Sequence, residues 1–130
     1  MISRIEPDGI FGVPDLASQV SVVESGSLAF LSGQLAWGDD GEVVGEGDHR
    51  TQAEHIAHRI DRILAELGAD RSHIVKETIY VVDYRPELVP VILGALHGTP
   101  PPSSTLVGVA KLAAPEFLVE VECVVSVPSA

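Results

Sequence analysis

The strongest constraint on the fold is an apolar repeat of helical period between residues 53 and 67. Its apolar side chains recur every three or four residues, so they share one stripe of an α-helix: Ala53, Ile56, Ala57, Ile60, Ile63, Leu64 and Leu67. Asp48 or Thr51 can cap the start of this helix, and Gly68 can end it. A helix with one apolar stripe has to bury that stripe against a second layer of structure.

The flanking segments have the alternation and the β-branched composition of strands. We expect strands at residues 18–25, 28–34, 73–82, 105–112 and 117–127. The first two segments are separated only by Gly26 and Ser27, which predicts a β-hairpin. The glycine-rich, acidic stretch 38–48 predicts a loop that can hold a short strand. A second helix is expected between Pro86 and Gly98.

This order of elements predicts an α+β domain in which two helices pack on one face of a mixed sheet. In the segment 117–127 every odd position is apolar, which predicts the side that faces the core. The even positions carry Glu120 and Glu122 beside Leu118 and Val124. The second face of the sheet would then lie uncovered and expose aliphatic side chains, so we expect the chain to self-associate.

Composition limits the partners of this domain, which is expected to span residues 1–130. The chain has 19 acidic and 8 basic residues, a formal charge of −11, and only three phenylalanines, two tyrosines and one tryptophan. Binding of nucleic acid draws on basic side chains and aromatic stacking, so nucleic acid is not expected as a ligand. One cysteine, no export signal and no long apolar segment predict a cytoplasmic protein without membrane contact.

Three motifs, in this order and spacing, resemble those of the RidA/YjgF superfamily. They are Ser32-Gly33-Gln34; Gln52 followed by Arg59-Ile60, Ile63-Leu64 and Gly68-Ala69; and Val107-x-Val109-x-x-Leu112 followed by Val119-Glu120-Val121-Glu122. The resemblance covers residues 20–125 and implies a chorismate-mutase-like fold. It also implies a homotrimer whose sheets form a central barrel, with small-molecule ligands in clefts between subunits and no cofactor.

The resemblance further implies a reaction and a set of site residues. Some family members are enamine or imine deaminases, which hydrolyse a C=N bond to a carbonyl and ammonia. Their substrate carboxylate is held by an arginine in a Pro-x-Arg-Ser pattern, and Ser104 occupies that position here. Such a contact contributes about 1.5–3 kcal/mol, so its loss predicts an altered substrate. Glu120 is the expected catalytic residue, and the expected ligand-binding residues are Ser32, Gly33, Ser104, Thr105 and Leu106.

Alternatives remain open for the function and for each part of this site. The protein can be a non-catalytic metabolite-binding trimer that keeps the cleft and lacks the hydrolysis. Glu120 can be a solvated edge carboxylate or a partner in an interface ion pair, and Ser104 and Thr105 can be turn residues after three prolines. The missing cation can also be replaced from elsewhere in the chain, by Arg4, Arg50, Arg85 or Lys111.

The remaining residues that could bind a metal or react are expected to have structural roles. Glu54, His55 and His58 lie one turn apart on the first helix, with His49 just before them, but this spacing differs from that of zinc proteases. We expect a solvated helix face and no metal. Trp37 is expected to pack at the rim of the barrel, although it can also line the cleft. Cys123 is expected to be an inert buried thiol.

Overall fold

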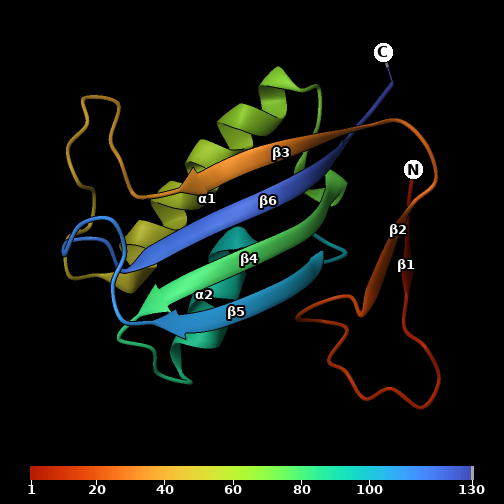
Figure 1. The fold of residues 1–130 in the computed structure, drawn as a ribbon, viewed down its shortest axis with the longest axis horizontal. Helices are drawn as coiled ribbons and strands as arrows, with labels where there is room; N and C mark the ends of the chain where they lie inside the picture. Colours follow the sequence, from red (N-terminus) through yellow and green to blue (C-terminus); the bar gives the residue numbers. More distant parts are fainter. Residues whose placement is uncertain (130) are drawn as a thin grey trace.

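The computed structural model describes residues 1–129 and contains two β-sheets and two α-helices (Figure 1). The elements in chain order are β1 (Ile2–Ile5), β2 (Val20–Val23), β3 (Ser27–Gln34), α1 (His49–Glu66), the 3-10 turn η1 (Arg71–His73), β4 (Ile74–Val82), α2 (Leu88–Leu96), β5 (Ser103–Val109) and β6 (Val119–Val127). None of these helices is long and apolar enough to cross a membrane.

The larger sheet is mixed, as the order of elements predicted. Its strands lie in the order β3-β6-β4-β5, with β4 and β5 parallel and the other pairs antiparallel. Both helices cover the same face of this sheet, and within residues 1–129 no helix or second sheet covers the opposite face (Figure 1). The helix α2 forms the crossover between the two parallel strands, since an antiparallel turn cannot connect them. The α+β prediction is therefore confirmed.

The apolar stripe of α1 and the odd positions of β6 form the core. Ile56, Ile60 and Leu64 of the helix are almost fully buried, as are Val119, Val121, Cys123 and Val125 of the strand. Asp48 caps α1 by accepting a hydrogen bond from the Thr51 amide. The prediction that Leu118 lies on the uncovered face was wrong, because Leu118 precedes the strand and packs in the core.

The predicted hairpin between residues 18–25 and 28–34 does not form. Instead, β2 pairs with β1, and β3 pairs with β6 in the larger sheet. Gly26 separates the two strands with a φ of 105°, a backbone conformation that favours glycine. At that residue the chain leaves the small sheet and enters the large one, so two adjacent strands end in different sheets.

Arg4 of β1 connects the small sheet to the large one. Its guanidinium donates to the Ser21 hydroxyl at 2.7 Å and to the carbonyl oxygens of Ser72 and Ile74 at 3.0 and 2.9 Å. The Ser21 hydroxyl in turn lies 2.8 Å from that of Ser103, at the start of β5. The hairpin of β1 and β2 is thereby held at the ends where β4 and β5 begin.

Candidate functional site

The uncovered face of the large sheet, called the open face below, mixes exposed apolar and polar side chains. Phe30 is 75% exposed on this face, and Leu28 and Val107 are also exposed. Cross-strand partners point to the same side of a sheet, so the register places on this face Phe30, Lys76, Thr78, Tyr80, Thr105, Val107, Glu120, Glu122 and Val124. The open face therefore presents apolar side chains to solvent beside its carboxyl and hydroxyl groups.

Glu120 and Gly33 lie against each other near the end of β3. The register between β3 and β6 shifts between Leu31 and Gln34, which places Ser32 and Gly33 in an irregular stretch of the strand. A Cβ atom built on Gly33 would lie 1.8 Å from Oε2 of Glu120. Only a glycine therefore leaves room for the carboxylate in this position. The structure brings together two of the sequence-predicted site residues, Gly33 and Glu120, and Ser32 precedes Gly33 in the chain.

The surroundings of Glu120 favour its protonated form. Burial raises the pKa of its carboxyl group, and the negative charge of Glu122 raises it further. Glu122 accepts a hydrogen bond of 2.5 Å from the Tyr80 hydroxyl, and this bond raises the pKa of the tyrosine. General acid–base chemistry uses carboxyl groups whose pKa has been raised in this way.

Ser104 faces the other way, toward the helices. Its hydroxyl donates to Oε2 of Glu77 at 2.7 Å, and Nε2 of His97 contacts the same oxygen. Glu77 is 2% exposed, although it carries a carboxyl group. Leu106, two residues further along β5, also packs against the core on this side. Within one chain the structure therefore separates Ser104 and Leu106 from Glu120.

Thr105 points to the open face, where Lys76 donates to its hydroxyl at 2.7 Å. Sequence reasoning missed this cation, although the alternation along residues 73–82 places position 76 on the face opposite Glu77. Among the described residues, Arg4, Arg50, Arg85 and Lys111 donate no hydrogen bond to Ser104. Arg4 comes nearest through its contact with Ser21, whose hydroxyl is bonded to that of Ser103.

Two histidines of α1, His49 and His55, have structural partners. Nε2 of His55 lies 2.6 Å from the carbonyl oxygen of Trp37, and Nε2 of His49 lies 2.7 Å from that of Val82. Within residues 1–129 no three metal-binding side chains come together. Trp37 packs edge-on against Phe117 with ring centroids 4.8 Å apart, which agrees with a packing role.

Cys123 is buried on the core side of β6, as the alternation of residues 117–127 predicted. Burial raises the pKa of its thiol to about 12, and the carboxylates of Glu77 and Glu122 add to the shift. The nucleophilic form of a cysteine is the thiolate, which is almost absent at neutral pH when the pKa is so high. The structure therefore supports an inert thiol.

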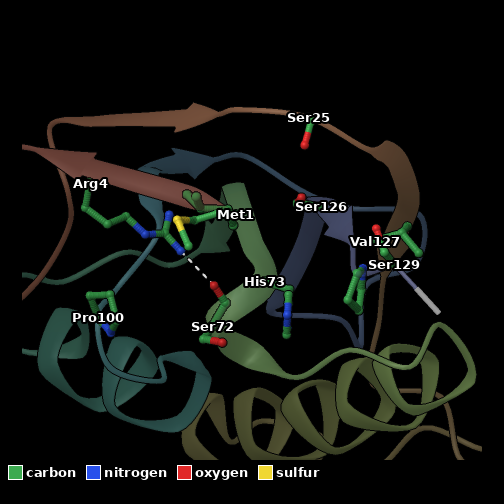
Figure 2. Close-up of a pocket in the computed structure, with 11 residues that line it drawn as sticks. Met1, Arg4, Ser25, Ser72, His73, Pro100, Ser126, Val127 and Ser129 are labelled. Carbon is green, nitrogen blue, oxygen red and sulfur yellow. Dashed lines mark hydrogen bonds between the residues drawn. The ribbon is translucent and has the colours of Figure 1, made fainter.

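A pocket of about 370 Å³ lies beside the small sheet, away from Glu120. Arg4 and Met1 line one side of it and Ser126 and Ser129 another, and Figure 2 shows the hydrogen bond from Arg4 to Ser72 within its wall. The guanidinium of Arg4 is already used in the hydrogen bonds that connect the two sheets. This pocket contains none of the sequence-predicted site residues.

Comparison with known proteins assigns the domain to a family. The family model described as Endoribonuclease L-PSP matches residues 14–127. A crystal structure of a conserved Rid family protein of unknown function, YyfB from Yersinia pestis, is 28% identical and superposes with a TM-score of 0.90, over 96% of this chain and 98% of that one.

Two further relatives match a smaller part of the chain. The structure of Rv2704 from Mycobacterium tuberculosis, a YjgF/YER057c/UK114 family member, is 29% identical with a TM-score of 0.65, and the match covers 85% of this chain and 86% of that one. Protein DfrA from Myxococcus xanthus is 36% identical over 66 residues, or 51% of this chain. The chain spans about half the length of this curated relative.

Proposed function

This chain belongs to the RidA/YjgF family, whose model is described as Endoribonuclease L-PSP, and we propose that it works as a homotrimer that hydrolyses an imine or enamine in clefts between its subunits. Family membership supports a small-molecule-binding role. The observation that carries the hydrolytic proposal is the carboxyl group of Glu120, which lies over Gly33 with a raised pKa. We further propose a cytoplasmic location, where a single reduced cysteine is expected.

The trimer is supported by the open face. Phe30 and Leu28 of β3 and Val107 of β5 expose apolar surface there, and burying such surface stabilises an assembly by about 25 cal/mol per Å². A sheet packed against two further copies would form the barrel that the family resemblance implies. The same packing would bring Glu120 of one subunit toward β5 of the next, where Ser104 and Leu106 lie on the other side of the sheet.

The proposed reaction consumes one water. Its oxygen attacks the carbon of the C=N bond, the nitrogen takes up protons and leaves as ammonia, and the carbon becomes a carbonyl. Glu120 would accept a proton from the attacking water and return it to the leaving nitrogen, a role that needs a pKa close to the working pH. Ser32 and Gly33 would shape the wall of the cleft beside it. Thr105 and the backbone of Leu106 would contribute from β5.

Ser104 distinguishes hydrolysis of ordinary 2-imino acids from the proposed altered reaction. Wild type should show little hydrolysis of 2-aminoacrylate generated from serine by a dehydratase. Ser104→Arg should raise kcat/KM by about ten- to a hundredfold, the worth of one charge-assisted contact. Adding Glu120→Gln should abolish the gain, because the amide cannot accept a proton. Strong hydrolysis of 2-aminoacrylate by the wild-type protein would refute the proposal that its substrate is altered.

A non-catalytic binding trimer is the second candidate, and the contact between Ser104 and Glu77 favours it. An arginine introduced at 104 would meet a buried carboxylate that could pair with it and hold it away from a ligand. The variant Ser104→Arg with Glu77→Gln removes that competition. If neither this variant nor Ser104→Arg gains activity, the binding protein becomes the better account.

RNA cleavage is not part of the proposal, although a similar structure from Klebsiella pneumoniae is titled a putative endoribonuclease. That structure is 22% identical, a likeness that concerns the fold. The formal charge of −11 opposes RNA binding, because affinity for a polyanion comes from cations that neutralise its phosphates. Salt-dependent binding of RNA at micromolar concentration would contradict this.

A further inference from the structure

We infer that the ligand of the proposed cleft presents a nitrogen hydrogen-bond donor, such as an ammonium or iminium group, to Ser104, and carries no carboxylate at that end. This inference rests on the proposed function, since it names the class of ligand for the same cleft. It follows from the way in which the hydroxyl of Ser104 is bonded to Glu77.

The proton of Ser104 is already committed. A hydroxyl has one proton to donate and two lone pairs that accept, and this proton goes to Oε2 of Glu77 at 2.7 Å. The direction holds whichever of Glu77 and His97 carries the proton between them, because Oε2 keeps a lone pair for the serine in both cases. Only lone pairs of Ser104 remain for a ligand.

The hydrogen-bond surroundings select against an anion at this point. Glu77 stands directly behind Ser104, is 2% exposed and takes the proton of the serine hydroxyl, so it leaves an anion no donor there. A ligand carboxylate would find neither a free donor on Ser104 nor an arginine or lysine bonded to it. Lys76 lies across the sheet, because its partner Thr105 follows Ser104 in the strand and points to the opposite face.

A cationic nitrogen fits the hydrogen-bonding capacity of the same place. Its N–H would donate to the free lone pairs of Ser104. A hydrogen bond that involves a charged group is worth about ten- to a hundredfold in affinity. The position that holds a substrate carboxylate in relatives with the arginine would thus recognise an amine or imine nitrogen here.

The test compares propylammonium with propionate, which differ in the group presented to the cleft and little in size. Calorimetry on the wild-type oligomer should show propylammonium binding at least about tenfold more tightly. Equal affinities, tighter binding of propionate, or no detectable binding of propylammonium would each overturn the inference. Lys76→Met, which leaves Ser104 intact, is the matched control for a cation on the other face and should keep the preference.

Two variants test the mechanism of the preference. In Glu77→Gln the new amide can donate to Ser104, which frees the serine proton for a ligand, so the preference should shift at least tenfold toward propionate. Ser104→Ala should lose the preference, whereas Ser104→Thr, which keeps the hydroxyl, should retain it. An unchanged preference in Ser104→Ala would overturn the inference even if Glu77→Gln fails to fold.

Hydrolysis separates this inference from the proposed function. Oxidation of propylamine and of 2-aminobutyrate by suitable oxidases generates two imines that differ only in the carboxylate. Faster hydrolysis of the carboxylate-free imine supports both ideas, whereas equal or faster hydrolysis of the imino acid overturns the inference and leaves the deaminase proposal standing. If neither imine is hydrolysed while propylammonium binds preferentially, the deaminase proposal fails and the inference stands.

Discussion

Replacing Gly33 with alanine should displace the carboxyl group of Glu120, the proposed catalytic group, while leaving the fold intact. The added Cβ would lie 1.8 Å from Oε2 of Glu120 and 2.8 Å from its Cδ, whereas real Cβ contacts are not shorter than 3.0 Å. The oxygen therefore has to move by at least about 1.2 Å. A misplacement of about 1 Å in a reacting group can cost on the order of a hundredfold in rate.

The effect of Gly33→Ala on stability should be small. Forcing Glu120 away from its rotamer costs about 0.5–1.5 kcal/mol, and replacing a glycine whose φ is not positive regains about 0.4–1 kcal/mol through the unfolded chain. Urea unfolding should place the variant within about 1 kcal/mol of wild type. Loss of hydrolysis without loss of stability would locate the effect at Glu120.

The assay pairs initial rates of imine hydrolysis with a carbon-13 NMR titration of the Glu120 carboxyl group. Its pKa should fall toward the ordinary value in the variant, because burial is the main cause of the raised pKa. Gly94→Ala is the matched control, since nothing lies within 4 Å of a Cβ at that exposed helical position. It should add up to about 1 kcal/mol of stability and leave the rate unchanged. A Gly33→Ala protein with unaltered rate and pKa would refute the reasoning.

Three further predictions concern assembly, pH dependence and thiol reactivity. Sedimentation equilibrium should give a mass of three times 13.7 kDa for wild type, and a stable wild-type monomer would contradict the trimer. The variant Phe30→Glu should dissociate the trimer, because the introduced charge would have to be buried in the interface. The folded pKa of Glu120 is raised, so its stabilising contribution is present below the unfolded pKa of about 4.3 and lost as the pH rises through the folded pKa. Glu120→Gln should therefore raise Tm at neutral pH and lose that advantage in acid, and a pH-independent difference would disprove this. Cys123 should react with an aromatic disulfide reagent only after unfolding, and rapid reaction of the native protein would show an open route to the thiol.

The helical and strand periods carried enough information to predict the layers of the fold. Two patterns each identify a buried face: the apolar stripe from Ala53 to Leu67 and the alternation in residues 117–127. Burial of that face decides how the helix or the strand packs. Strand partners were harder to predict, because the short sequence separation between β2 and β3 favours a hairpin. The strand β1, which is the real partner of β2, has only four residues, too few for their alternation to identify a strand.

The candidate site was predictable in its members and less so in their directions. The family resemblance placed Glu120 in one cleft with Ser32 and Gly33, and the pairing of β3 with β6, which the sequence did not predict, puts Glu120 against Gly33. The sequence did not separate Ser104 from Thr105, whose side chains point to opposite faces. Consecutive residues of a strand point to opposite faces, but the strand was predicted to begin at residue 105, whereas β5 begins at Ser103 and includes Ser104. The contact between Ser104 and Glu77 depends in addition on the register between β4 and β5, which tertiary pairing fixes.

The position of β6 has a consequence for synthesis of the chain. This strand is the last of the four to be made, yet it lies between β3 and β4 and pairs with both. While a ribosome is still translating residues up to 118, β3 has no partner in the large sheet and one edge of β4 stays open. Unpaired edges of this kind promote aggregation. Nascent chains should therefore depend on chaperones until β6 emerges, and truncations before Val119 should be found in inclusion bodies.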